Sequence, residues 1–141
     1  MALLFDTDAI SEVLRARPAE LYLTWLRTIP TDEQCTTAIT VAELYWGACR
    51  SPARERHLRK IEEVLLPALQ VLSFDAKAAR QFGELKAQLE SQGTPLADAD
   101  LQIASIALAE GHELVTGNLR HFSRIPGLRI NTALAASRPA R

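Results

Sequence analysis

Several oxygen-bearing side chains directly follow short apolar segments of this chain, or lie one helical turn beyond them. They are Asp6, Glu43, Asp98, Asp100 and Asn118. If these side chains converge in the fold, their carboxylates repel one another. At least one must then hold a proton at a raised pKa, or the group must bind a cation.

The residue types in this set favour a hard divalent cation. Carboxylate and amide oxygens are the ligands that Mg²⁺ and Mn²⁺ prefer, and the absence of His and Cys disfavours zinc. A cation held in this way can activate water and stabilise the leaving oxygen of a phosphodiester. Metal-dependent phosphodiester hydrolysis is therefore one hypothesis for the function.

Each acid also has an ordinary structural interpretation. Asp6 could cap the helix that follows it, and Thr40 with Glu43 matches a capping box. Asp98 is a favourable N-cap, which places Asp100 in the first helical turn, where the helix dipole favours a carboxylate. The functional interpretation depends on all of these residues meeting in one fold.

Short apolar strands alternate with helices along the chain. Strands are expected within residues 2–5, 33–40, 69–75, 112–118 and 127–131, and helices over 8–16, 18–29, 39–50, 53–69 (bent near Pro67), 76–93 and 98–111. This order predicts an α/β fold, a three-layer α/β/α sandwich with a parallel sheet of about five strands. Ligands of such folds bind beyond the carboxyl ends of the strands, where the polar residues above are expected.

Length and composition are those of one globular domain. We expect it to span residues 1–132, with a fraying tail over residues 133–141, in a chain of 141 residues that is 48% hydrophobic. Cys35 and Cys49 lack metal-ligand spacing and are expected to be free thiols. We find no signal peptide and no apolar stretch of membrane-spanning length, so a cytoplasmic location is expected.

The formal net charge of −1 argues against a generally basic nucleic-acid-binding surface. Local basic clusters remain, over residues 50–60 and 120–129. They include Arg50, Arg54, Arg120, Arg124 and Arg129. These clusters are either solvated surfaces or contacts for a nucleic-acid backbone.

Three segments, taken together, resemble the PIN-domain family, and especially the VapC-type toxins of bacterial toxin–antitoxin modules. They are LLFDTDAISEVL, TTAITVAELYWGA and ADADLQIASIALAEGHELVTGNLRHFSRIPGLRI. The resemblance extends from Ala2 to about Asn131. It implies a parallel five-stranded sheet, the PIN-like fold, and a Mg²⁺- or Mn²⁺-dependent endoribonuclease that cuts RNA, with tRNA or rRNA as the expected substrate.

The resemblance also implies residue roles. The family's acidic positions fall on Asp6, Glu43 and Asp100 as metal ligands, with Asn118 as the fourth position of the catalytic set. Thr116 belongs to the same T-x-N element and is a secondary candidate, as are Asp98 and Asp8. Asp8 departs from the family, which usually has Asn after the Asp-Thr pair.

Partners are implied in the same way. Relatives form homodimers and bind a VapB-type antitoxin in higher hetero-oligomers. If Leu21, Tyr22, Trp25 and Leu26 form an exposed apolar strip, it is a candidate groove for an antitoxin helix. His121 is expected at the rim of the site without a catalytic role.

Two alternatives remain open at this stage. The segment LLFDTDAIS also resembles the D-x-D signature of haloacid-dehalogenase-like phosphatases, with Asp6 as nucleophile and Asp8 as general acid. The order of the motifs disfavours this, since Asp98 and Asp100 precede Thr116 and no lysine follows Lys86. The second alternative is a catalytically inactive PIN-like binding module.

Overall fold

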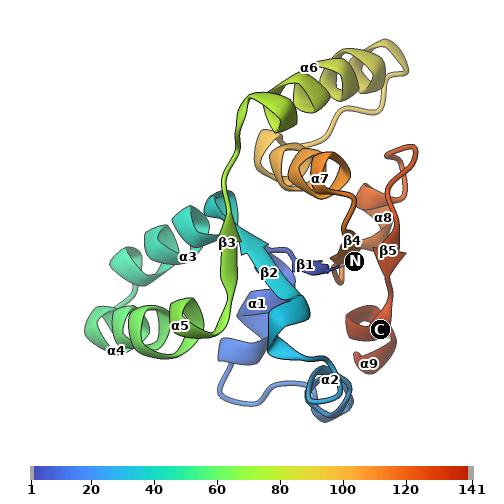
Figure 1. Cartoon of the computed structure of the whole chain (residues 1–141). Helices are drawn as coiled ribbons and strands as arrows, with labels where there is room; N and C mark the ends of the chain where they lie inside the picture. Colours follow the sequence, from blue (N-terminus) through green and yellow to red (C-terminus); the bar gives the residue numbers. More distant parts are fainter. Residues whose placement is uncertain (1, 140–141) are drawn as a thin grey trace.

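Five short strands form a parallel sheet in the computed structural model, which describes residues 2–139 (Figure 1). The strand order is β3-β2-β1-β4-β5, and every pairing is parallel. The strands are β1 (Leu3–Phe5), β2 (Gln34–Thr37), β3 (Gln70–Leu72), β4 (Glu113–Val115) and β5 (Ile130–Asn131). The expected fold class is confirmed.

Helices connect the strands and cover the sheet on both faces. They are α1 (Thr7–Leu14), α2 (Glu20–Leu26), the 3₁₀ turn η1 (Thr31–Glu33), α3 (Ala38–Arg50), α4 (Arg54–Arg59), the π-helical segment η2 (Lys60–Leu65), α5 (Leu66–Ala68), α6 (Ala76–Ser91), α7 (Asp98–Glu110), α8 (Leu119–Phe122) and α9 (Ala133–Ser137). Because parallel strands need crossover connections, helices between consecutive strands are expected in this fold.

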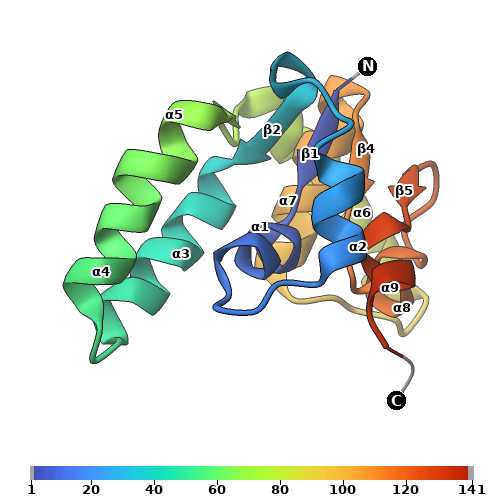
Figure 2. The ribbon, with the colours of Figure 1, turned by 90° about the horizontal axis from the view of Figure 1, so that it is seen from below.

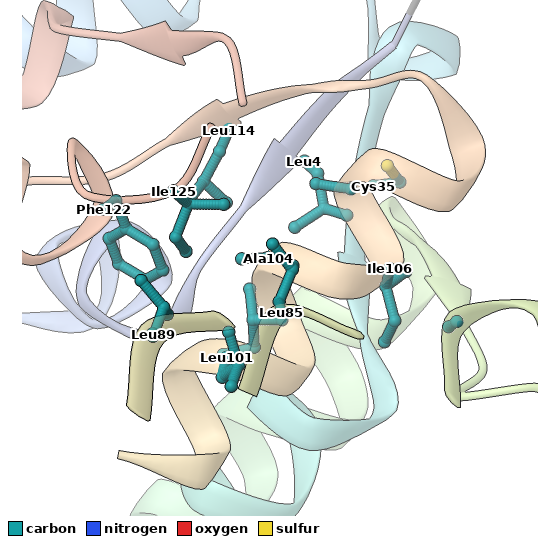
Figure 3. Packing of buried hydrophobic residues seen from close by; sticks show 13 residues of the cluster. Leu4, Cys35, Leu85, Leu89, Leu101, Ala104, Ile106, Leu114, Phe122 and Ile125 are labelled. Atoms are coloured by element: carbon teal, nitrogen blue, oxygen red, sulfur yellow. The ribbon is translucent and has the colours of Figure 1, made fainter. Parts of the chain in front are cut away.

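Alternate residues of the central strands enter two separate hydrophobic clusters. Leu4 and Leu114 pack with residues of α6, α7 and α8 on one face (Figure 3). Phe5 and Val115 pack on the other face with residues of α1, α2 and α9. Both faces of β1 and β4 are therefore buried, which explains why these strands are apolar throughout.

The edge strand β3 differs from this pattern. Gln70 and Val71 are exposed, so the segment 69–75 is not a fully buried strand as its apolar sequence suggested. The preceding helix extends from Arg54 to Ala68 and includes a π-helical segment. The N–H of Leu66 donates to the carbonyl of Ile61, one position further than in an α-helix. Pro67 lies beside this segment, which agrees with the expected irregularity there.

The expectation of a fraying tail is wrong for the part of residues 133–141 that is described. Residues Ala133–Ser137 form α9, and Leu134 is completely buried in the cluster with Phe5 and Tyr22. Figure 2 shows that α9 packs beside α2. Burial of Leu134 provides the free energy that orders this short helix. Ala140 and Arg141 lie outside the described residues.

The sheet topology determines where a ligand can bind. The chain moves from β1 to β2 on one side and returns to β4 on the other side of β1. The crevice beyond the carboxyl ends of β1 and β4 is the usual binding place in such a sheet. Asp6 directly follows β1, and residues 116–118 directly follow β4. Within residues 2–139, no helix is both long and apolar enough to span a membrane.

Candidate acidic site

A cleft of about 870 Å³ lies at the carboxyl ends of β1 and β4. Its lining combines the predicted acids with residues of the C-terminal segment: Asp6, Thr7, Asp8, Ser11, Glu43, Asp100, Gly117, Asn118, Ala135, Arg138 and Pro139. The structure thus brings together the four residues predicted as the catalytic set, and we call this space the acidic cleft.

Asp6 is a buried carboxylate whose ionised form is only partly compensated. It is 4% exposed, and its Oδ1 accepts a hydrogen bond of 2.8 Å from the backbone N–H of Ala9, which caps α1. Burial raises its pKa to about 7, with smaller contributions from the charges of Asp8 and Asp100. Hydrogen bonds from Thr116 and Ala9 oppose this rise. Asp6 is therefore a helix cap that also lines the cleft.

Glu43 lines the cleft and is not part of a capping box. Thr37 caps α3, since its hydroxyl accepts from the N–H of Thr40 at 3.0 Å, so the expected cap at Thr40 is wrong. Glu43 then lies on the second turn of α3, and its Oε1 accepts a 2.6 Å hydrogen bond from the hydroxyl of Thr7. This bond joins α3 to the first turn of α1.

Asp100 comes from the first turn of α7 and is half-buried. Burial raises its pKa, and the nearby charge of Glu43 adds to the rise, while His121 lowers it. Nδ1 of His121 lies 3.9 Å from an oxygen of Asp100 and 2.8 Å from the side-chain nitrogen of Asn118. His121, expected at the rim, thus contacts two of the predicted site residues.

The loop after β4 is held by its own threonine. The hydroxyl of Thr116 accepts a 2.9 Å hydrogen bond from the N–H of Asn118 and also hydrogen-bonds to Asp6. Thr116 is completely buried. The T-x-N element therefore fixes the loop against the first acid, in agreement with the secondary role expected for Thr116.

Asp98 is not part of the cleft. Ala97 precedes α7 as its N-cap residue, so the expectation that Asp98 caps the helix is wrong. The exposed Asp98 side chain forms a 3.0 Å ion pair with Lys86 of α6. Asp98 and Asp100 therefore lie in the same helical turn but contact different partners.

Asp8 lies in the cleft but has a partner. Both of its oxygens accept hydrogen bonds from Arg138, at 2.7 and 2.8 Å. The hydrogen bonds of Arg138 hold the pKa of Asp8 below its usual range. No local sequence pattern predicts this contact, because Arg138 lies 130 positions from Asp8, in the expected tail.

A cation in the acidic cleft would have to take most of its ligands from water or from a substrate. Within residues 2–139, no three acidic, His or Cys side chains are close enough to enclose a metal ion by themselves. The oxygens of Asp6, Glu43 and Asp100 nevertheless line one cleft, and burial or mutual repulsion raises the pKa of two of them. Mg²⁺ is usually bound by one or two carboxylates together with water and substrate phosphate.

A second cleft of about 540 Å³ adjoins the acidic cleft and has a basic wall. Thr7, Ser11 and Glu43 line both spaces. The remaining lining comes from α1, α3 and the α4–η2 helix and includes the cationic or titratable side chains Arg15, Arg56, His57 and Lys60. We call this space the basic cleft.

The four arginines proposed as RNA contacts do not line either cleft. Arg50 lies over the ring of the exposed Trp46, and Arg54 lies 3.9 Å from Glu55. Arg120 and Arg124 are exposed on and after α8. Their contact with RNA stays a prediction, whereas Lys60, from the same basic cluster over residues 50–60, lines the basic cleft together with Arg15.

Arg129 and the proposed apolar strip are placed elsewhere. The Arg129 guanidinium donates to the carbonyl of Gly111 at the amino ends of β4 and β5, opposite the acidic cleft. Tyr22 is completely buried and donates to the carbonyl of Ala9, and Trp25 stacks on it. These residues therefore do not form an exposed apolar strip, although Leu21 is exposed.

Known proteins with similar sequences include proteins named as ribonucleases. A family model described as "PIN domain" matches residues 3–128. The chain is 38% identical to ribonuclease VapC2 of Haemophilus influenzae over 126 residues, covering 89% of this chain and 93% of that protein. It is 36% identical to the tRNA(fMet)-specific endonuclease VapC of Salmonella typhimurium over 127 residues, covering 90% and 94%.

Solved structures show the same similarity. The crystal structure of VapBC2 from Rickettsia felis, bound to a DNA fragment from its promoter, superposes with a TM-score of 0.84 at 31% identity. The superposition covers 93% of this chain and 98% of that one. DNA-bound VapBC from Salmonella typhimurium gives a TM-score of 0.83 at 35% identity, covering 93% and 97%.

Proposed function

The chain belongs to the PIN-domain family with VapC ribonucleases as relatives, and on this premise we propose that it is a Mg²⁺- or Mn²⁺-dependent endoribonuclease, the toxin of a toxin–antitoxin module. The observation that carries the metal dependence is the acidic cleft. Asp6, Glu43 and Asp100 come from three different elements and line one space. Within residues 2–139, His121 near Asp100 is the one cationic or titratable basic side chain at salt-bridge distance from any of them.

The three carboxylates are the proposed cation ligands, and their neighbours keep them oriented. Thr7 holds Glu43, Thr116 and Ala9 hold Asp6, and His121 lies beside Asp100. A divalent cation bound here supplies positive charge that orients the scissile phosphate and lowers the pKa of an attacking water. Hydrogen-bonded ligands of this kind retain their geometry when substrate arrives.

Asn118 has a different role because it is neutral. With its amide nitrogen 2.8 Å from Nδ1 of His121, its amide oxygen remains available toward the cleft. We propose that this oxygen would accept a hydrogen bond from the attacking water or from the substrate. Attack of water on the RNA phosphodiester would leave fragments with 5′-phosphate and 3′-hydroxyl ends.

RNA approaches the acids along the basic cleft. Arg15, Arg56 and Lys60 offer positive charge, and Leu14, Leu44 and Ile61 offer apolar surface in the same space. Phosphates that flank the scissile bond can pair with these cations, while the acidic cleft receives the bond itself. This arrangement supports RNA as the substrate in a protein whose net charge is −1.

The phosphatase alternative is not favoured. Its general acid, Asp8, needs a proton at neutral pH, whereas Arg138 holds the pKa of Asp8 below its usual range. An inactive binding module is not favoured either, since the acids of the cleft are retained and oriented.

The proposal includes partners. Structures of relatives from Rickettsia felis and Salmonella typhimurium are described as VapBC complexes on DNA. By extension, this chain forms a homodimer and binds a cognate VapB-type antitoxin that blocks the acidic cleft. Light scattering of the chain alone and with the product of a neighbouring small gene tests both expectations.

Cleavage of structured RNA tests the enzymatic proposal. We expect cleavage with Mg²⁺ or Mn²⁺, loss of cleavage in EDTA, and its return when metal is added back. Sequencing of RNA ends after induced expression in bacteria identifies the target, with tRNA or rRNA expected. Equal cleavage by wild type with and without EDTA contradicts the metal-dependent mechanism.

A further inference from the structure

An ion-pair network at the edge of the acidic cleft joins the C-terminal segment to α1. Arg138 donates to both oxygens of Asp8 at 2.7 and 2.8 Å. Its Nε and Nη2 also donate to one oxygen of Glu12, at 3.1 and 2.9 Å. We call these three residues the C-terminal clasp. Such planar, bidentate contacts are the strongest that an arginine makes with a carboxylate.

The clasp is built into the fold and does not lie loosely on the surface. Glu12 is 2% exposed, and its second oxygen accepts from the N–H of Ala19 at 3.2 Å, just before α2. The clasp therefore connects α1, the start of α2 and the segment after α9. A carboxylate is costly to bury without a partner, and Arg138 supplies two hydrogen bonds to Glu12, while Arg15 lies 3.7 Å from it.

The loop after β4 also belongs to this arrangement. The backbone of Gly117, between Thr116 and Asn118, hydrogen-bonds to the Asp8 carboxylate. A Cβ at position 117 would overlap Nη1 of Arg138 and Oδ2 of Asp8. A side chain at position 117 would therefore displace the ends of the Arg138 and Asp8 side chains, which meet the T-x-N loop at this point.

The clasp also determines the charge of the cleft. Asp8 lines the same cleft as Asp6, Glu43 and Asp100, so its negative charge acts on that space. Four of the five N–H groups of the Arg138 guanidinium are occupied by Asp8 and Glu12, so little of it is left to bind a phosphate. Arg138 is placed to neutralise Asp8 and has little capacity to hold RNA itself.

We propose that Arg138 is a positioning residue of the nuclease site, which neutralises Asp8 and holds Asp8 against the loop of Gly117, so that Asp8 and Arg138 function only as a pair. This inference rests on the proposed ribonuclease function. It accounts for the acid at position 8, since an arginine from the C-terminal segment compensates the charge that an asparagine would not carry.

A double-mutant cycle tests the pair, with wild type, Arg138→Gln, Asp8→Asn and the double variant. In Arg138→Gln, the unpaired Asp8 adds negative charge to the cleft. We expect the KM for RNA to rise by about tenfold, because phosphates are repelled. Mn²⁺ binding to the same protein should tighten about threefold, because the added charge attracts the cation.

The double variant distinguishes the possible roles of Arg138. If Arg138 neutralises Asp8, removing the charge of Asp8 restores KM and Mn²⁺ affinity to within about twofold of wild type. A double variant as poor as Arg138→Gln overturns the inference, since Arg138 then binds RNA directly or acts through packing. Weakening of both RNA and Mn²⁺ binding in Arg138→Gln overturns it as well.

A steric perturbation provides a second test. Gly117→Ala should separate Arg138 from Asp8 and raise KM in the same direction. Gly83→Ala on α6 is the matched control, because a Cβ there meets no atom within 4 Å, and KM should not change. Thermal unfolding of every variant verifies that folded protein is compared, and an unchanged KM in folded Gly117→Ala contradicts the inference.

Failure of the proposed function is recognised separately. If neither the wild type nor the Asp6→Asn variant cleaves RNA, the ribonuclease proposal is refuted. The Mn²⁺ titration does not depend on turnover and still tests the clasp. Equal Mn²⁺ affinity in wild type and Arg138→Gln then counts against the neutralising role of Arg138.

Discussion

Two groups of carboxylates lie side by side at the same edge of the sheet and differ in their partners. Asp6 and Asp100 in the acidic cleft are near other acids, and burial raises the pKa of both. Asp8, in the C-terminal clasp, is paired with Arg138, which lowers its pKa. Asp8 is only two residues from Asp6.

The difference separates the acids that we propose as cation ligands from the acids that stabilise the fold. A carboxylate with a guanidinium partner is satisfied and has no need of a metal. Carboxylates whose neighbours are other carboxylates are stabilised when a divalent cation binds.

Replacing one acid of the cleft should abolish activity. Asp6→Asn removes a proposed cation ligand while keeping a group that can cap α1, so RNA cleavage should fall about a thousandfold with little loss of stability. The matched control is Asp98→Asn, whose exposed side chain pairs with Lys86 and should leave cleavage unchanged. Initial cleavage rates measure both, and comparable losses in the two variants contradict the distinction.

Stability of the metal-free protein should depend on pH through the cleft. The folded pKa of Asp6, about 7, exceeds its ordinary value of 3.8, so the folded state binds the proton more tightly. The free energy of unfolding should therefore fall as pH rises from about 4 to about 7, by up to roughly 4 kcal/mol, and then level off. Urea unfolding in EDTA measures this fall.

Asp8 and Asp6 titrate in different windows. The stability that Asp8 contributes is complete above its unfolded pKa and is lost only as pH falls below about 4. Mg²⁺ should reduce the fall between pH 4 and 7, because it favours ionised carboxylates, and Asp6→Asn should flatten it. A profile that is identical in wild type and Asp6→Asn argues against Asp6 as its source.

Breaking the clasp should destabilise the fold. Glu12→Ala leaves Arg138 without one partner and removes the acceptor for Ala19, so the free energy of unfolding should decrease by about 3 kcal/mol. Glu84→Ala is the matched control, since Glu84 forms an exposed pair with Arg80 that contributes about 0.5 kcal/mol at most. Chemical denaturation measures the free energy of unfolding of both variants. If both lose the same amount, the burial of the clasp does not contribute to stability.

The smallest effect is expected at the basic cleft. Lys60→Gln should weaken RNA binding about fivefold and reduce the salt dependence by about one charge. Arg129→Gln, at the opposite edge of the sheet, should leave RNA binding unchanged. Filter binding in the Asp6→Asn background, over a range of salt concentrations, distinguishes the two. If both substitutions weaken RNA binding equally, the positive charges act diffusely and the basic cleft is not a defined path for RNA.

Much of this arrangement could be predicted from the sequence. Buried parallel strands show as unbroken apolar runs, and the rule that ligands bind beyond their carboxyl ends located Asp6, Glu43, Asp100 and Asn118 together. The caps were less accessible, since Thr37 and Thr40 are both good caps and only the start of α3 decides between them. Asp98 was assigned incorrectly for the same reason.

Local hydrophobic patterning and motif order are enough to predict the parallel sheet, the alternation of strands and helices along the chain, and the identity of the cleft acids. Which of the acids are paired depends on the tertiary structure. The contact between Asp8 and Arg138 spans 130 positions and depends on α9 being anchored by Leu134. Local pattern carries no information about such a contact, because two charges meet there only after the hydrophobic packing has brought the chain ends together.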